Sequence, residues 1–146
     1  MSLKSQNKIK LNLGGLKMKK EEIITLIIIA IIIISNAVSQ NYTRKCISEM
    51  DSRLSEIKNA TLRKEKTNDE LLNDLKDLYD DWEEKNESLS YYIEHDELEK
   101  VNTQIIATKG YYEADLEDDA VPELEKGIYI LEHIKEKQSF NLKNIF

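Results

Sequence analysis

Two short runs combine histidine with carboxylates, the side chains that most often bind divalent metal ions. They are Glu94-His95-Asp96-Glu97 and Glu132-His133. If the helices that carry them were neighbours, both histidines and the nearby carboxylates could converge on one ion. The spacing argues against this, because the sequence has neither a His-Glu-x-x-His motif nor a pair of Glu-x-x-His motifs. We therefore predict no metal site and no cofactor; the candidate ligands, if a metal binds, are His95, His133, Glu94 and Glu132.

A structural role explains these histidines more simply. His95 would help to end one helix, and His133 would lie late in another, where the helix dipole favours a positive charge. The competing hypothesis is a metal- or ligand-sensing domain built on the two histidines and their neighbouring carboxylates.

Residue types that serve catalysis lack the surroundings that catalysis needs. Ser88 and Ser90 have no flanking glycines, and the single cysteine, Cys46, lies on an amphipathic segment where we expect it in the core. The four glycines are scattered, so no glycine-rich phosphate loop exists. The acidic residues of 115–119 lack the spacing and central glycine of a calcium loop and are expected to face solvent. We predict that the protein is not an enzyme.

An uncharged stretch, Ile23–Val38, is the strongest signal in the chain. As a helix its 16 residues span about 24 Å, and extension to Tyr42 gives about 30 Å, the thickness of a bilayer's hydrocarbon core. Its nine isoleucines and one leucine should favour insertion by roughly 3–6 kcal/mol. We predict a transmembrane helix over residues 21–42, with Tyr42 at the membrane interface.

Two other interpretations of this stretch compete with the transmembrane helix. A buried core helix would need an apolar shell that the acidic remainder of the chain cannot supply. A secretory signal is the stronger rival, because lysines precede the apolar run and Ala37-Val38-Ser39 resembles a cleavage site. Cleavage after Ser39 would release a secreted helical protein.

The basic residues around the span predict its orientation. Residues 1–20 form a lysine-rich arm that should stay in the cytoplasm, which leaves the C-terminal part outside, although Arg44 and Lys45 oppose this arrangement. Met18 is an alternative start, because a bacterial ribosome-binding site translated in frame can encode the Gly14-Gly15 run before it.

The charge is divided unevenly along the chain. Met1–Ser39 has six lysines and two glutamates, a balance of +4, and the rest has 15 basic and 26 acidic residues, a balance of −11. Nucleic-acid binding depends on neutralising phosphates, so a part this acidic should not bind DNA or RNA.

Past the span, the apolar residues recur with a helical period. Ile47, Met50, Leu54, Ile57 and Thr61 share one face of a helix expected over about 41–62. Thr67 and Glu70 form a capping-box pattern ahead of a second helix, expected to end near Tyr92. A third should end at Lys109-Gly110, and a fourth near Lys137, with Asp118 or Asp119 as its N-cap and Pro122 in its first turn.

These elements predict an all-α protein: one transmembrane helix followed by a small antiparallel bundle of about four helices over residues 43–137. Trp82 lies on the stripe of Leu71, Leu75 and Leu78 and should be buried in the core. Residues 138–146 form an apolar tail whose near-alternation suits an extended strip against the protein's own bundle or another protein; its apolar residues are Phe140, Leu142, Ile145 and Phe146.

Several of these features together resemble one protein family. They are the Lys-Lys pair before an isoleucine-rich segment, Trp82, the run Glu94–Leu98, and the end Leu142-Lys143-Asn144-Ile145-Phe146. The chain resembles domain-of-unknown-function 4363 proteins, small membrane-anchored proteins of clostridia and related Firmicutes. The resemblance extends from Met18 onward and implies an uncleaved span with a helical outer domain. It assigns no catalytic residue.

The sequence thus favours a single-pass protein of the cell membrane with a cytoplasmic N-terminus. Its bundle would be a non-catalytic accessory or interaction module of the cell envelope. The expected partners are the lipid bilayer and another envelope membrane protein or a second copy of the chain.

Overall fold

The structure is a computed structural model that describes residues 12–13, 16–17 and 19–143. The chain divides into two compact units, Met1–Ser39 and Gln40–Phe146. The helix α1 (Lys20–Arg63) belongs to both, because it continues without a break through Ser39. The predicted transmembrane helix and the predicted first helix of the bundle are therefore parts of one helix. The uninterrupted run has a simple cause, since no glycine or proline occurs between Lys20 and Arg63.

The first unit contains a short hairpin and the beginning of α1. Strands β1 (Asn12–Leu13) and β2 (Leu16–Lys17) pair antiparallel, a feature that the periodicity of the sequence did not predict. Two glutamates lie in the first turn of α1, where the helix dipole favours negative charge. One of them, Glu22, also accepts a hydrogen bond of 2.8 Å from the backbone N–H of Lys19.

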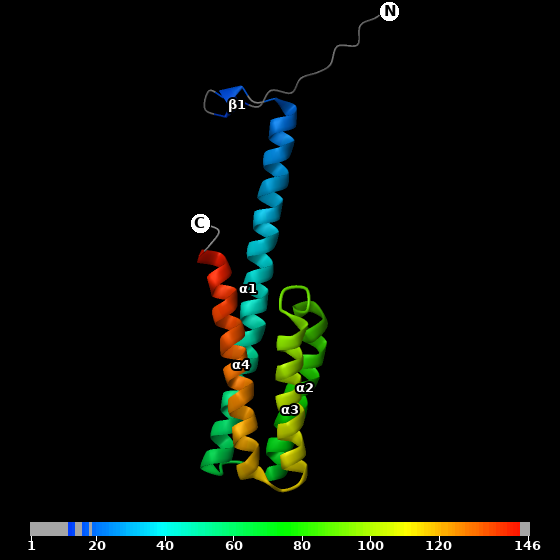
Figure 1. The fold of residues 1–146 in the computed structure, drawn as a ribbon, viewed down its shortest axis with the longest axis vertical. Coiled ribbons are helices and arrows are strands. Elements are labelled where there is room, and N and C mark those ends of the chain that lie inside the picture. The colour runs from blue at the N-terminus through cyan, green and yellow to red at the C-terminus, as the bar shows by residue number, and fades with distance from the viewer. Residues whose placement is uncertain (1–11, 14–15, 18, 144–146) are drawn as a thin grey trace, which may run out of the picture. The chain divides into compact units, whose positions relative to one another are not determined.

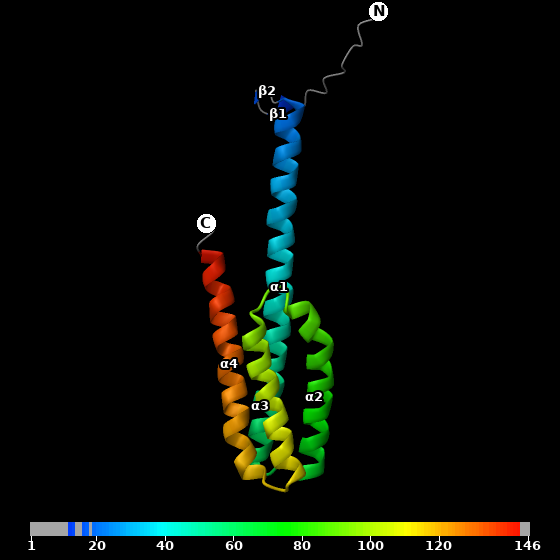
Figure 2. The same cartoon turned by 45° about the vertical axis from the view of Figure 1, so that its right-hand side comes forward.

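The second unit is an antiparallel bundle of four helices (Figures 1 and 2). The last part of α1 is followed by α2 (Asn68–Leu89), α3 (His95–Glu113) and α4 (Glu117–Lys143), and consecutive helices run in opposite directions. The predicted all-α class and the helical bundle are confirmed. The apolar core contains Cys46, Ile47, Met50, Leu54, Ile57, Ala60, Leu71, Leu75, Leu78, Trp82, Leu89, Ile93, Leu98, Val101, Ile105, Tyr112, Ala120, Leu124, Leu131 and Ile134.

A glycine allows three helices of the bundle to approach closely. Gly127 of α4 is buried, and a Cβ atom there would lie 3.3 Å from Leu54 Cδ1 of α1 and 3.5 Å from Gln104 Cβ of α3. Because Gly127 has no side chain, α4 can pack closely against both neighbours. This close packing compensates for the low helix propensity of glycine.

The predicted helix boundaries are partly right. The capping box is present, because the Thr67 side chain accepts from the Glu70 N–H while the Glu70 carboxylate accepts from the Thr67 N–H. Helix α2 ends at Leu89 rather than near Tyr92, and α3 continues past Gly110 to Glu113. Gly110 does not end the helix because the chain reverses later, at Asp115.

The start of α4 and the tail differ from the predictions. Helix α4 begins at Glu117, so Pro122 lies in its second turn rather than its first. The helix then continues to Lys143, which contradicts the predicted extended strip at Phe140 and Leu142. The helical backbone hydrogen bonds can continue because no proline follows Pro122. The near-alternation of a few apolar residues is a weaker indication of an extended segment than this is of a helix. Ile145 and Phe146 lie outside the described residues.

Candidate functional site

Two of the four candidate metal ligands, Glu94 and His133, lie in one cluster around Lys137 and Glu97. Glu94 and His95 lie at the start of α3, and Glu132 and His133 lie on α4. His95 is exposed in a hollow lined by Glu83, Asn86, Glu87 and Ser90 of the α2 end. It begins a helix instead of ending one, so the structural role predicted for it was wrong.

Lys137 lies between the carboxylates of Glu94 and Glu97, close to His133. The Lys137 Nζ atom is 2.9 Å from Glu94 Oε1 and 3.1 Å from Glu97 Oε1, and His133 Nε2 is 3.9 Å from the same Glu97 oxygen. Hydrogen bonds to the two carboxylates raise the pKa of Lys137 above its usual value. An ammonium group thus supplies the positive charge that a metal ion would supply.

This cluster connects the beginning of α3 to the end of α4. Glu97 is buried, and a buried carboxylate needs a charged partner, which Lys137 provides. Among residues 19–138, whose side chains are described, no group of three or more His, Cys, Asp and Glu side chains could hold a metal ion. The geometry therefore favours an ion-pair cluster that fixes two helices.

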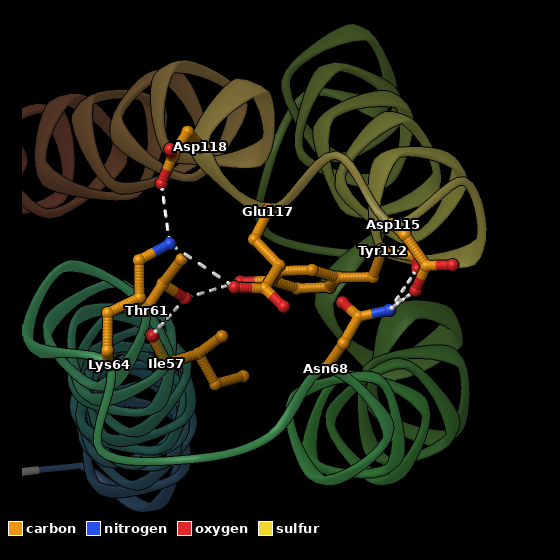
Figure 3. A network of polar contacts seen from close by, with 8 residues as sticks. All are labelled: Ile57, Thr61, Lys64, Asn68, Tyr112, Asp115, Glu117 and Asp118. Carbon is orange, nitrogen blue, oxygen red and sulfur yellow. Dashed lines mark hydrogen bonds and ion pairs between the residues drawn. The ribbon is translucent and has the colours of Figure 1, made fainter.

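The opposite end of the bundle carries a second polar cluster, at the α1–α2 and α3–α4 connections (Figure 3). The Lys64 Nζ atom lies 2.7 Å from Asp118 Oδ1 and 3.3 Å from Glu117 Oε2, so it links the end of α1 to the start of α4. These hydrogen bonds raise the pKa of Lys64. Asp115, Asp118 and Asp119 are exposed, as predicted, whereas Glu117 is half-buried. Glu117 and Asp118 also pair with Lys64 across the two connections.

Asn68 connects α2 to the end of α3. Its Nδ2 atom donates to the carbonyl oxygen of Tyr112 at 2.5 Å and to Asp115 Oδ1 at 2.7 Å. The start of α2 is thereby hydrogen-bonded to the end of α3, as Figure 3 shows.

A buried hydrogen-bond chain lies beneath this surface. The Thr61 hydroxyl donates to the Ile57 carbonyl oxygen at 2.8 Å, and the Tyr112 and Thr61 hydroxyls are 2.7 Å apart. Because Thr61 has one proton to give, Tyr112 is the donor in the second bond. Burial raises the pKa of Tyr112, since the phenolate would lose its hydration.

The turns at this end have an unusual backbone. Lys64 and Asp115 have φ values of 54° and 56°, in the left-handed region that favours glycine. The following residues, Glu65 and Leu116, donate back to the carbonyls of Ala60 and Tyr111. Both helices therefore end in Schellman motifs, with a charged residue where glycine is usual. The predicted end of the first helix, at about residue 62, agrees with the end of α1 at Arg63. The end of α3 was predicted too early, at Lys109-Gly110, because glycine was used as the stop signal.

The other predicted site residues are structural or lie at the end of the chain. Trp82 is fully buried, as predicted, and its Nε1 atom has no hydrogen-bond partner within the described part of the chain. Cys46 is buried, also as predicted. Ser90 donates its hydroxyl proton to the Glu87 carbonyl oxygen of its own helix end at 2.7 Å.

Three exposed tyrosines, Tyr42, Tyr91 and Tyr92, lie at the end of the bundle that contains Lys137. Tyr91 and Tyr92 lie in the α2–α3 connection with their rings 6.4 Å apart, and Tyr42 lies close to Ser88 and Lys85 of α2. Sequence reasoning placed Tyr42 at a membrane interface but gave no role to Tyr91 and Tyr92. The Tyr-Tyr pair between two helices was the signal that could have found them.

Comparison with known proteins identifies the family. The family model described as Domain of unknown function (DUF4363) matches residues 37–145, and the chain belongs to this family. The match begins after most of the isoleucine-rich stretch, so it covers less of the chain than the sequence resemblance suggested, and it includes most of the tail. No curated protein and no solved structure matches the chain.

Proposed function

We propose that this protein is anchored in the cell membrane by the first part of α1. Its bundle would be held outside the cytoplasm, as a non-catalytic accessory or interaction module of the cell envelope. The observation that supports the anchor most directly is the exposure of the apolar side chains in α1. The large apolar residues from Ile24 to Val38 are mostly 46–64% exposed, and none of the most apolar window is buried.

An exposed surface of this kind requires an apolar environment. Soluble proteins rarely expose continuous apolar patches of this size, and a bilayer supplies the missing environment. The buried-core interpretation of the stretch is therefore disfavoured. The lysines before the span favour a cytoplasmic N-terminus.

The non-catalytic role is supported by how the charged residues are used. Lys137 pairs with Glu94 and Glu97, and Lys64 pairs with Glu117 and Asp118. In both clusters the charges hold helices together instead of facing one reaction centre.

One experiment distinguishes this proposal from release of the bundle. Release after Ser39 has some support, because the whole core of the bundle lies after that residue. The mass of the protein extracted from membranes should include the isoleucine-rich segment, and protease added outside intact protoplasts should digest the bundle. A mass that begins at Gln40 would support the secreted form, and full protection from the protease would reverse the orientation.

The interaction role has its own test. Extracted in a mild detergent, the protein should migrate as a complex larger than one chain in its micelle, and stronger detergent should reduce it to one chain. A single chain under both conditions would contradict the interaction role and leave the anchor untouched.

A further inference from the structure

We infer that the groove between α3 and α4, two helices that run side by side in Figure 2, binds a second copy of this chain. The groove has a volume of about 580 Å³, and its lining includes Lys100 of α3 and Pro122, Lys126 and Tyr129 of α4. This pairing rests on the membrane anchoring and the interaction role proposed above, and it names both the partner and the surface that binds it.

The outward face of α4 carries apolar residues that the core of the bundle does not use. Pro122 is exposed, Tyr129 is 70% exposed, and Ile130 is half-buried beside them. Residues seven positions apart face the same way in a helix, so Pro122 and Tyr129 form one outward stripe. Tyrosine is enriched in protein interfaces, because its ring supplies apolar area while its hydroxyl stays hydrated. The stripe is therefore suited to a contact with another protein.

Opposite charges flank this stripe on its two sides. Glu125 lies on the side of α1, where its carboxylate is 3.7 Å from Lys58 Nζ. Lys126 lies on the side of α3, on the same ridge of the helix as Lys137, which contacts Glu94 and Glu97 of α3. The side chains of Glu125 and Lys126 are 60% and 58% exposed, so both can also pair with a second molecule.

This order of charges is complementary to itself. A two-fold axis parallel to α4 brings the α1 side of one α4 against the α3 side of the other. Glu125 of each copy then meets Lys126 of the other copy, and each Tyr129 lies over the groove of the other copy. A second copy supplies this complementary arrangement by symmetry, and two-fold dimers are the commonest oligomers.

The same axis keeps the two bundles parallel. Each chain enters its bundle at Gln40, so both chains enter at the same end of the dimer, which is compatible with anchoring in one membrane. The contact uses parts of only two helices in each copy. We therefore expect weak association of the bundle in dilute solution and stronger association where anchoring confines both copies to one membrane and raises their effective concentration.

The test measures energy transfer between two labelled forms of the purified full chain in phosphatidylcholine vesicles. A donor or an acceptor dye is attached at Tyr91→Cys in a Cys46→Ala background, because Tyr91 is 78% exposed and lies in the α2–α3 connection, away from the groove lining. Dilution with lipid gives the association constant of each variant. Circular dichroism checks that every variant keeps the helix content of the wild type.

We expect Tyr129→Ala and each single reversal, Glu125→Lys or Lys126→Glu, to weaken association severalfold. The double reversal, Glu125→Lys with Lys126→Glu, should restore most of it, because each new lysine then meets a new glutamate of the other copy. The matched control is Lys109→Glu, which reverses one charge of an exposed ion pair elsewhere on α3 and should leave association unchanged.

Three results would overturn the dimer. If association persists unchanged in Tyr129→Ala and in both single reversals, the copies meet at another surface. If the double reversal is as weak as the single ones, Glu125 and Lys126 do not pair between copies. If the purified wild type does not associate although native membranes yield a larger complex, the partner is another protein, and the proposed interaction role stands without the dimer. Single chains in both preparations contradict the interaction role as well.

Discussion

Trp82 contributes to stability through its volume and not through a hydrogen bond. It is fully buried on α2, on the stripe that includes Leu75 and Leu78, and its indole N–H is unpaired in the described part of the chain. Burying an indole gains a large apolar area, whereas its unpaired N–H reduces that gain. At the scale of one residue, the core depends on how this ring fills space.

Trp82→Ala should therefore lower the free energy of unfolding by about 3–5 kcal/mol. The measurement is urea unfolding of Gln40–Phe146, the unit that contains the whole core. Tyr129→Ala is the matched control, because Tyr129 is a large ring on α4 that is 70% exposed, and its loss should change stability by less than about 0.5 kcal/mol. Equal effects of the two substitutions would contradict the burial of Trp82.

Tyr112 gives the stability a dependence on alkaline pH. Its pKa is raised in the folded protein by burial, so folding favours the protonated phenol. The stabilisation is complete below the unfolded-state pKa of about 10 and is lost as the pH rises through the folded-state pKa.

Tyr112→Phe removes both the titration and the bond to Thr61. Near neutral pH the variant should be less stable than the wild type by roughly 1 kcal/mol, the usual value of a hydrogen bond. As the pH rises above about 10, this difference should shrink, because the wild type loses the stabilisation that depends on a protonated Tyr112 and the variant has no phenol at this position. Urea unfolding at neutral and alkaline pH measures it, and a difference that stays constant would argue against the buried phenol.

At the scale of the element, the ends of α1 and α3 carry backbone strain that glycine would relieve. Lys64 has a φ of 54°, a conformation unfavourable for a residue with a Cβ. Lys64→Gly and Lys64→Ala both remove the ion pairs to Glu117 and Asp118, but only glycine removes the strain. The glycine variant should melt several degrees above the alanine variant. Equal melting temperatures would contradict the left-handed conformation at Lys64.

The end of α4 should add little to the stability of the bundle. Among the residues whose side chains the structure describes, Ile134 is the last in the core, and Gln138 bonds to the Tyr92 carbonyl. Removal of residues 139–146 should therefore leave the melting temperature of Gln40–Phe146 nearly unchanged in the absence of lipid. A fall of several degrees would mean that the segment packs on its own bundle.

At the scale of the whole molecule, the structural features that the sequence predicted correctly are those that depend on periodicity and local capping. The stripe from Ile47 to Thr61, the burial of Trp82 and the capping box at Thr67 all follow from nearest-neighbour geometry along a helix. These features determine the all-α class and the four-helix bundle.

The features that the sequence did not predict depend on contacts between distant segments. The pairing of Lys137 with Glu94 and Glu97 needs the register of α3 against α4, which no local pattern contains. The reversals at Lys64 and Asp115 use residues that rarely adopt positive φ, so the third helix was expected to end at Gly110. The prediction of an extended strip at Phe140 and Leu142 was wrong because alternation over a few apolar residues is a weak signal where nothing interrupts the helix.

The central claim is that the first part of α1 spans the membrane. Its most direct test is alkaline carbonate extraction of the full chain and of the double variant Ile29→Lys, Ile31→Lys. Two lysines there should cost roughly 5–7 kcal/mol of insertion free energy, enough to cancel the estimated gain.

The matched control is Leu62→Lys with Ile106→Lys, which adds the same charge at apolar side chains that are 58% and 51% exposed in the bundle unit. The wild type and the control should stay in the membrane pellet, and the span variant should move to the soluble or aggregated fraction. Retention of the span variant in the membrane, equal to that of the control, would contradict the account.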